Sequence, residues 1–569
     1  MHIFNKHIAM TVVLILFLFA LVTMTPTTFA QQVPNIGGAM KQAAPPPKET
    51  PAKKETPSVP VIIQEEEKPF SLPEGEKIFI KDFKIEGAGK ADENDLAALL
   101  APYKGRDLTM AEITEASNKL TVFYRDKGYL VAKAYVPKQD ATGGILVIRI
   151  IMGAYGKFSL KNASPVRDFL LQGVFDKITE TSPVVTRDGL ERAILLIREM
   201  PGANMPTVTV APGTQPETSD FTVEVDRSQR FNGYLMGDNQ GSKYTGRERI
   251  YGGIDINSPL GFADKFSVSA MTTEKSGLQN LRASYGFPLA YDGLRAEVAA
   301  SRVKYKLGGE YSDLDATGLA DVLEGTISYP VKRSRDVNMD LSLNVAYKRL
   351  RDEIAATYTE NPRDVSVWTL ALQRAAFGSL FGRNLSTTMS AGVSIGTLNI
   401  RDDDQKALNY AGAKTSGNFS RLNLAFSGNL ELTEKFSLRA QAKVQQVLTS
   451  GNLDSTEQMF ISGSTGVKAY TESVSFDNGY VAGTELRYAL PTFFGVKHAL
   501  GAFFDNGWVY AQNGGYTTND RIMLTDAGLG YYVSFKQLFG GIQLAYPIGK
   551  DSSVEDPGTR VLAQVGMTF

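Results

Sequence analysis

The sequence contains no cysteine and only three histidines. The absence of cysteine excludes disulfide bonds and thiolate metal sites. His2 and His7 lie in an N-terminal leader, so His498 is the only histidine in the rest of the chain. One histidine without cysteine is a poor basis for a zinc site, a Ser-His pair or a Cys-His pair. We therefore expect no enzyme, no catalytic residue, no bound metal and no cofactor.

The sequence also lacks an excess of either charge, with 60 Lys and Arg against 61 Asp and Glu. This balance gives no electrostatic reason to expect a nucleic-acid partner. No Gly-x-x-x-x-Gly-Lys-Ser/Thr segment occurs, so we expect no bound nucleotide. Tryptophan occurs only twice, whereas tyrosine and phenylalanine occur 24 and 30 times. Abundant Tyr and Phe are typical of membrane strands bordered by aromatic girdles.

After the first 30 residues, no apolar run is long enough to cross a membrane as a helix. Residues 1–30 have the pattern of a secretory signal peptide, with a positive start at Lys6, an apolar run over 8–22 and small residues around Ala30. A membrane anchor is the less favoured alternative, because the run is shorter than the ~20 residues that a bilayer requires. If the mature chain enters a membrane, we expect it to do so as a β-barrel.

Residues 31–76 are rich in Pro, Lys and Glu and contain few large apolar side chains. So little apolar surface cannot offset the entropy that is lost on ordering, and we expect an extended linker. Within the linker, residues 37–44 can form a short helix, which could serve as a plug. The sequence does not decide between a plug helix and a simple tether.

Two small α/β units follow the linker, and in each we expect the order β-α-α-β-β. The first spans residues 77–153. Its second helix begins at a capping box formed by Thr109 and Glu112, and it ends at Gly128. The expected elements are a strand over 78–85, helices over 92–100 and 109–128, and strands over 130–137 and 145–152.

The second unit spans residues 154–226 and repeats this order. We expect Ser164 and Pro165 to cap its first helix, which ends near Phe175. The other expected elements are a strand over 155–160, a helix over 186–200, and strands over 207–210 and 221–226. Each three-stranded sheet then has an open edge, which can bind an extended client segment by β-augmentation. The alternative is that the two units are rigid spacers.

From Arg227 onward the apolar period changes to two. Apolar residues alternate with polar or charged ones over 339–348 and again over 436–445. A soluble sandwich also alternates, but the number of such runs, the leader and the C-terminus favour a membrane barrel. One face of the final segment carries Val561, Ala563, Val565, Met567 and Phe569. Residues 227–569 can hold 16 antiparallel strands at about 21 residues per strand and loop.

A glycine-bearing segment from Phe460 to Tyr470 carries a single cation, Lys468. Two carboxylates, Glu485 and Asp505, follow inside alternating, otherwise apolar runs. Successive side chains of a strand point to opposite faces, so if the apolar neighbours face lipid, these carboxylates face the lumen. We therefore expect a loop that folds back into the barrel and is held there by charge. The alternative is a solvated loop lysine above a wet pore lined by carboxylates.

The α/β units resemble POTRA (polypeptide-transport-associated) domains. The resemblance is best over residues 120–137, where a helix, an aromatic residue, Gly128-Tyr129, a strand and Pro137 follow one another in the order of that family. The next residues, Lys138-Gln139-Asp140, resemble the Pro-x-Gln-Asp turn of the two-partner-secretion branch.

Residues 234–249 and 255–264 resemble the start of the barrel in two-partner-secretion transporters (the TpsB, or hemolysin secretion-activation, family). The residues that match this barrel-start motif are Asp238, Asn239, Gly241, Tyr244, Gly246, Asn257, Pro259, Gly261 and Asp264. Ser258 departs from the pattern, because it stands between Asn257 and Pro259. With the POTRA-like units and the C-terminal third, the resemblance covers about residues 77–569.

The loop segment resembles the Val-Arg-Gly-Tyr motif at the tip of the family's sixth extracellular loop. At these positions this chain has Val467, Lys468, Ala469 and Tyr470. The family's arginine points into the lumen and pairs with acidic strand residues, whose positions match Glu485 and Asp505. Lysine keeps the charge but cannot form a bidentate fork, so we expect a looser pairing. Alanine in place of glycine also disfavours a positive φ at the tip.

The resemblance implies a 16-stranded transmembrane barrel preceded by two POTRA domains, in the outer membrane of a Gram-negative bacterium, with the POTRA domains in the periplasm. It implies that Phe569 is the C-terminal barrel signal. The implied function is export of an unfolded hemolysin- or adhesin-like partner, so the expected partners are this client and outer-membrane lipid. The alternatives are a barrel-assembly insertase of the same superfamily and a passive porin or receptor barrel. The sequence identifies neither the client nor the oligomeric state.

Overall fold

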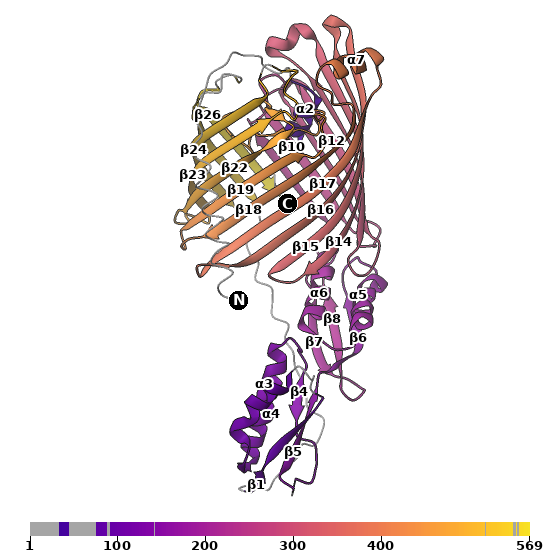
Figure 1. The fold of residues 1–569 in the computed structure, drawn as a ribbon, viewed down its shortest axis with the longest axis vertical. Helices are drawn as coiled ribbons and strands as arrows, with labels where there is room; N and C mark the ends of the chain where they lie inside the picture. Colours follow the sequence, from indigo (N-terminus) through magenta and orange to yellow (C-terminus); the bar gives the residue numbers. More distant parts are fainter. Residues whose placement is uncertain are drawn as a thin grey trace.

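The computed structural model is a closed β-barrel with two small α/β units joined in line at one end (Figure 1). The predicted signal peptide and most of the predicted linker lie outside the residues that the structure describes. No helix in the described part of the chain has the length and apolarity needed to cross a membrane. The described residues are 34–44, 76–87, 92–141, 143–517, 519–549, 554 and 557–569.

The first α/β unit contains a three-stranded sheet, a two-stranded sheet and two helices. The larger sheet has the order β2-β5-β4, and β1 pairs with β3. The predicted strand over 78–85 is therefore two strands that meet at Lys81, because its halves pair with different partners. The elements are β1 (Lys77–Ile80), β2 (Asp82–Glu86), α3 (Glu93–Leu100), the 3₁₀ turn Ala101–Tyr103, β3 (Arg106–Thr109), α4 (Met110–Asp126), β4 (Lys133–Tyr135) and β5 (Ile145–Ile151).

Helix α4 begins at the predicted capping box. The Glu112 backbone N–H donates to Thr109 Oγ1 at 3.3 Å, and the Thr109 backbone N–H donates to Glu112 Oε2 at 2.8 Å. The hydrogen bonds that the Thr109 backbone N–H and hydroxyl donate to the Glu112 carboxylate hold its pKa below its usual range. One face of the helix, including Ile113 and Leu120, is buried against the sheet. The chain then reverses at Gly128, whose φ of 100° suits glycine.

The second α/β unit has the sheet order β6-β8-β7. Its second helix starts where predicted, with Thr186 as its N-cap residue. The predicted Ser164-Pro165 cap is wrong, because Ser164 Oγ donates to Asn162 Oδ1 at 2.6 Å and the residue at the N-cap is Arg167. The first helix also continues beyond Phe175. The elements are β6 (Ala154–Asn162), α5 (Asp168–Thr181), α6 (Arg187–Arg198), β7 (Thr207–Pro212) and β8 (Thr218–Val225).

Sixteen strands within the described residues close the barrel, each antiparallel to its neighbours, which confirms the predicted architecture. The first strand, β9, pairs with the last, β26. The strands are β9 (Phe231–Asp238), β10 (Arg249–Asn257), β11 (Lys265–Thr273), β12 (Leu278–Pro288), β13 (Arg295–Lys306), β14 (Ala316–Arg333), β15 (Val337–Ile354), β16 (Thr359–Leu380), β17 (Arg383–Ile400), β18 (Gly417–Glu431), β19 (Phe436–Val447), β22 (Asn478–Ala489), β23 (Lys497–Tyr510), β24 (Arg521–Phe535), β25 (Leu538–Pro547) and β26 (Arg560–Thr568).

The alternation in the sequence matches the two faces of the barrel wall. On β15, Leu341, Leu343 and Tyr347 are exposed on the outer face, as expected of strands that face lipid. Lys348, which lies between two outward residues, reaches the lumen and pairs with Glu457. The same alternation in β19 leaves Phe436 and Val444 outside. The period-two pattern therefore predicts correctly which side chains face outward.

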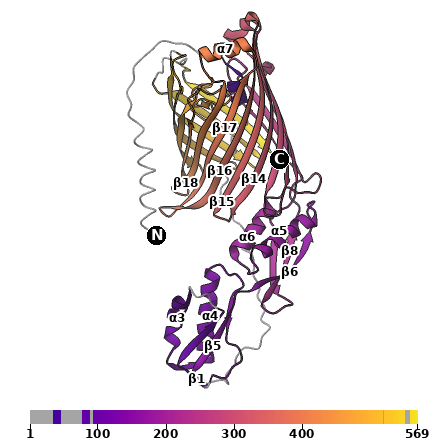
Figure 2. The same cartoon turned by 45° about the vertical axis from the view of Figure 1, so that its right-hand side comes forward.

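Several strands are much longer than the roughly ten residues that cross an outer membrane. Strand β16 has 22 residues, and β14, β15 and β17 have 18 each. These strands extend past the rest of the rim at the end away from the α/β units, which we call the far end, where α7 (Asp403–Ala411) lies (Figure 2). One wall of the barrel thus rises above the other.

The second α/β unit is attached to the near end of the barrel by polar contacts from α6 and the turn after it. Glu199 forms an ion pair with Arg333 at 2.9 Å, and Glu191 pairs with Arg335 at 3.3 Å. Arg192 donates to the Asp292 carbonyl at 3.1 Å. These contacts reach two different near-end turns, so they restrain the orientation of the unit beneath the pore.

Candidate functional site: a loop and a short helix inside the barrel

The long loop between β19 and β22 folds back into the barrel from the far end. It contains a small hairpin made by β20 (Met459–Phe460) and β21 (Ser475–Phe476). An apolar cluster joins the loop to the inner wall. Its members include Ile461, Val467, Phe476, Phe503 and Leu524, all buried. The apolar contact and the ionic contacts described next give the loop a fixed position in the lumen.

Lys468 lies at the tip of this loop and pairs with Asp505 on β23. The distance from Lys468 Nζ to Asp505 Oδ2 is 2.5 Å, and the two side chains are only 12% and 2% exposed. The ammonium group also lies 4.4 Å from the centre of the Phe503 ring. Gly483 makes room for the carboxylate, because a Cβ there would stand 2.2 Å from Asp505 Oδ1. Of the two carboxylates expected to pair with Lys468, the structure therefore places Asp505 in contact with it.

Glu485 does not pair with Lys468, contrary to the expectation from the sequence. It forms an ion pair with Arg487 at 2.7 Å and accepts a hydrogen bond from Tyr532. The strand register explains this difference, since Asp505 lies opposite Gly483 and not opposite Glu485. Two residues along a strand correspond to about 6.6 Å, so Glu485 lies one step nearer to the α/β units, where Arg487 neutralises it.

A second carboxylate, Asp526 on β24, holds the loop tip instead. The Ala469 backbone N–H donates to Asp526 Oδ2 at 2.6 Å, and Asp526 lies directly opposite Asp505 in the β23–β24 register. Both carboxylates are almost completely buried. Asp526 was not predicted from the sequence. The signal that could have identified it is the one that identified Asp505, a charged residue within an alternating run.

The four motif residues at the tip adopt a compact turn. Ala469 is buried and its φ is not positive, so glycine is not required at this position. The Val467 N–H donates to the Ile461 carbonyl, and the Gly463 N–H donates to the Tyr470 carbonyl, both at 2.7 Å. The positive φ of this segment is at Gly463. The motif therefore presents Lys468 and the Ala469 amide to the wall together.

The base of the loop has further ionic anchors that the sequence did not reveal. Glu457 is completely buried and lies 2.5 Å from Lys348 and 2.8 Å from Arg421. Arg363 bridges Asp454 of the loop, at 2.7 Å, and Asp352 of β15, at 2.8 Å. The pairs of Glu457 and Asp454 join the loop to strands that are distant in the sequence, so only the fold brings them together.

A short helix, α2 (Ile36–Ala43), also lies in the lumen, beneath the far rim and against the inside of β12–β15 (Figure 1). The structure thus contains a helix where the sequence allowed one over residues 37–44. Asn35 caps the helix, since its Oδ1 accepts from the Gly38 N–H at 3.1 Å. The helix and the loop pack against each other and together occupy the far half of the lumen.

The barrel-start motif does not form one site, because its halves lie at opposite ends of β10. In the far half, Asp238 pairs with Arg249 at 2.7 Å. Asn239 crosses the seam, since its side chain donates to the Val561 carbonyl at 3.0 Å and accepts from the Ala563 N–H at 2.8 Å. Three other motif residues build the adjoining β9–β10 loop: Gly241, Gly246 and the buried Tyr244.

The near half of the motif forms a turn that meets the second α/β unit. Asp264 is completely buried and accepts from the Leu260 and Phe262 N–H groups and from Tyr285 Oη. Asn257 donates to the Gln229 carbonyl at 2.8 Å. Gly261 accepts from the Arg167 N–H at 3.0 Å. The remaining motif residue, Pro259, lies in this turn, half-buried.

The C-terminal residue, Phe569, completes the seam at the near end. It exchanges two backbone hydrogen bonds with Gly233, at 2.8 and 3.0 Å. Its ring covers Gly233, where a Cβ would stand 2.3 Å from Phe569 Cζ.

Among the described residues, no group of three or more His, Asp or Glu side chains could hold a metal ion.

Comparison with known proteins shows which family has this architecture. Residues 217–533 match the model of the haemolysin secretion/activation protein ShlB/FhaC/HecB, and residues 78–153 match the ShlB-type POTRA domain. The heme/hemopexin transporter protein HuxB of Haemophilus influenzae is 24% identical over 453 residues, which cover 79% of this chain and 78% of that protein. The outer membrane transporter CdiB of Dickeya dadantii is 20% identical over 523 residues, which cover 89% of each chain.

A solved structure has the same fold. CdiB from Escherichia coli aligns with a TM-score of 0.70 at 18% identity, over 94% of this chain and 95% of that chain. The family model supports a secretion transporter and not an insertase. The chain belongs to the haemolysin secretion/activation family and is an outer-membrane β-barrel transporter, with its POTRA units on the periplasmic side.

Proposed function

We propose that this transporter captures one unfolded partner protein in the periplasm and exports it through the barrel after the loop and α2 leave the lumen. The observation that carries the proposal is the way in which the lumen is closed. The closing segments are held by ion pairs and small apolar contacts between distant parts of the chain, such as Lys468 with Asp505 and Arg363 with Asp454. They share no strand pairing with the barrel wall among the described residues, so they can leave while the barrel stays closed.

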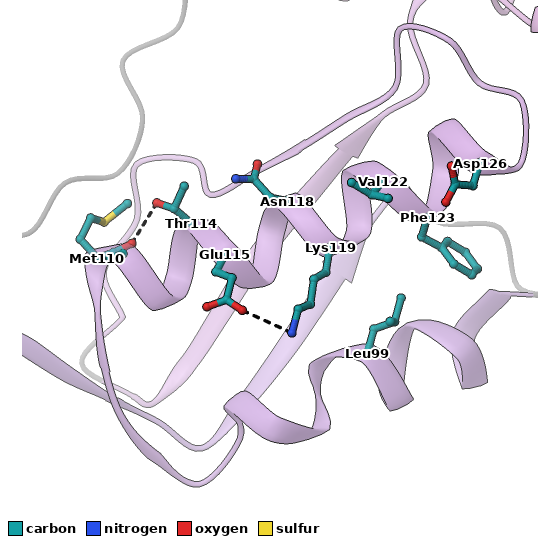
Figure 3. A pocket seen from close by; sticks show the side chains of 10 residues that line it. Leu99, Met110, Thr114, Glu115, Asn118, Lys119, Val122, Phe123 and Asp126 are labelled. Carbon is teal, nitrogen blue, oxygen red and sulfur yellow. Dashed lines mark hydrogen bonds and ion pairs between the residues drawn. The ribbon is translucent and has the colours of Figure 1, made fainter.

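The periplasmic units offer two kinds of surface to a client. One is the strand edge, since β4 forms one edge of its sheet opposite β2, and β7 forms one edge of its sheet opposite β6. The other is a shallow groove of about 870 Å³ along α4, bordered by Leu99 of α3 and lined by Met110 and Phe123 among others (Figure 3). We assign capture to the edges, because main-chain hydrogen bonds can bind an unfolded client of any sequence. Strand β7, with six residues, offers a longer edge than β4, with three.

Export in this scheme is driven by folding of the client outside the cell. The sequence has no P-loop motif, and the proposal requires no nucleotide. Folding of a domain releases about 5–15 kcal/mol, which is enough to make passage of a folding segment effectively one-way. In this scheme the client emerges at the far rim, where the wall formed by β14–β17 projects (Figure 2).

Secretion by living cells tests the proposal. A candidate partner is produced in Gram-negative cells with and without this chain, and the medium, the periplasm and the levels of unrelated outer-membrane barrels are measured. We expect the partner in the medium only when the chain is present, with unchanged levels of other barrels. Retention of every tested partner in the periplasm, together with a fall of other barrels when the native chain is removed, would instead identify an insertase.

Capture by the strand edge is tested by crosslinking, which the absence of native cysteine makes selective. Single cysteines with a photoreactive label are placed at Thr209 on the β7 edge and at Val122 in the groove. The control is Asp176, which is exposed on α5. We expect crosslinks to the unfolded partner from Thr209 and not from Asp176. Crosslinks from Val122 alone would move capture to the groove.

A further inference from the structure

The near half of the lumen has an uncharged stretch on one wall. On strands β15–β18 the outward side chains are mostly apolar, as at the exposed Leu341 and Trp368. Because successive side chains of a strand point to opposite faces, the residues between them face the lumen. We call the following lumen-facing side chains the neutral track. They are only Ser, Thr, Asn, Gln, Ala and Gly, and they lie within residues 342–344, 369–373, 386–394 and 423–429.

The strand register joins these side chains into continuous rows. In one row, Asn344 lies opposite Thr369, and Thr369 lies opposite Ser394. The next row towards the near end runs from Ser342 through β16 and β17 to Asn423. Neighbouring strands are about 4.8 Å apart, so a row across β15–β18 is about 15 Å wide. Ser342, Asn344, Thr369 and Asn423 are partly exposed, so the neutral track presents polar groups to the lumen.

Charged side chains begin at both edges of the neutral track. On one side, Arg282 of β12 pairs with Glu297 of β13 at 3.4 Å and with Glu324 of β14. On the other side, Arg439 of β19 lies directly opposite Asn429 of β18. A charged wall retains client residues of opposite charge, whereas hydroxyl and amide groups form hydrogen bonds that add little net stability over those with water. The neutral track is therefore the part of the wall on which a polar chain is held least tightly.

Both ends of the neutral track lead to features of the export path. At the near end, Arg335 in the turn between β14 and β15 pairs with Glu191 of the second α/β unit at 3.3 Å. Above the track, the wall becomes apolar at Val367 and Phe419, which belong to the buried cluster that includes α2. The same strands, β15–β17, form most of the wall that projects at the far rim (Figure 2). The track thus runs from the periplasmic unit to the segments that close the lumen.

We propose that the neutral track is the surface along which the extended client crosses the near half of the lumen, and that it contacts the main chain of the client. This inference rests on the proposed function and adds to it the wall that the client follows. Hydroxyl and amide side chains can donate to peptide carbonyls and accept from peptide N–H groups whatever the client sequence. Conduction also requires contacts weak enough for the passing chain to leave again, and a surface without charge supplies them.

Crosslinking from single cysteines tests the contact, since the chain has no native cysteine. A photoreactive label is placed at Ser390 on the neutral track or at Gln543 of β25, which lies across the lumen and donates to Tyr532 Oη at 2.7 Å. The client is a partner found in the medium in the secretion test, fused to a folded domain that stalls it in transit. We expect crosslinks from Ser390 and not from Gln543. Equal crosslinks from both positions, or crosslinks from Gln543 alone, would overturn the proposal.

A charge placed on the neutral track provides the functional test. Gln373→Glu and Gln373→Lys should each slow secretion about 2- to 5-fold, because either charge retains client residues of the opposite sign. The matched controls, Gln543→Glu and Gln543→Lys, should secrete at the wild-type rate, and folded barrel levels are measured in all variants. Wild-type secretion by both Gln373 variants would overturn the neutral track and leave the proposed function intact. No secretion by the wild-type chain would instead overturn the proposed function.

Discussion

Replacing Lys468 with methionine is expected to release the loop tip from the barrel wall. In the docked loop the ammonium lies 2.5 Å from Asp505 Oδ2, and the two side chains are 12% and 2% exposed. Methionine keeps the contact with Phe503 but leaves Asp505 beside Asp526 without the ammonium that now faces them. Removing one partner of a buried ion pair costs about 3–5 kcal/mol, which is about a 10²- to 10⁴-fold shift toward the undocked loop.

The assay measures how often the tip leaves its place. Val467 is completely buried in the docked loop, and the chain contains no cysteine, so Val467→Cys provides a single reporter thiol. Its rate of reaction with a maleimide follows the population of the open loop when opening is fast compared with labelling. Lys435→Met, at an exposed lysine in a near-end turn, serves as the control and should leave the rate unchanged.

The double variant Lys468→Met/Asp505→Asn separates charge from packing. It removes the carboxylate that Lys468→Met leaves uncompensated, and a neutral pair in a buried site is much less unfavourable than a single unpaired charge. The double variant should therefore label more slowly than Lys468→Met. Labelling of Lys468→Met at the control rate, or faster labelling of the double variant than of the single one, would refute the reasoning.

Three other changes have defined outcomes. Lys468→Arg should slow labelling of the Val467→Cys reporter, because a guanidinium can donate to two carboxylate oxygens at once; unchanged labelling would count against this. Glu457→Gln weakens the pairs with Lys348 and Arg421, and it should raise the open probability of the channel by at least about tenfold. Glu434→Gln, at an exposed residue, is its control. Phe569→Ala should lower the heat-resistant, folded barrel in outer membranes several-fold, and equal levels would show that the ring over Gly233 is dispensable.

Much of the fold could be predicted from the sequence, because its signals are local. The period of two fixes which residues face lipid, and the Thr109–Glu112 capping box locates the start of α4. Strand length could not be predicted, since β16 continues beyond the membrane with the same alternation. The cap predicted at Ser164 is wrong because the Ser164 hydroxyl donates to Asn162 Oδ1, ahead of the helix start.

The candidate site was predictable only where one motif carried it. Lys468 and Asp505 stand in recognisable segments, and the structure places them in contact. The roles of Asp526 and Glu485 depend on strand register, which brings Asp526 opposite Asp505 and leaves Glu485 one step away. Alternation identifies inward-facing carboxylates but does not tell which of them lie at the same height in the barrel.

The central claim is that the loop must leave the lumen for the client to pass, and a reversible lock tests it most directly. A Cβ built at Gly507 on β23 lies 2.8 Å from Ile461 Cβ, so Ile461→Cys/Gly507→Cys can form a disulfide after a small adjustment toward the usual separation of about 3.8 Å. We predict that partner secretion stops when this disulfide forms, returns on reduction, and is normal in each single variant. Secretion at the wild-type rate with the disulfide intact would contradict the account.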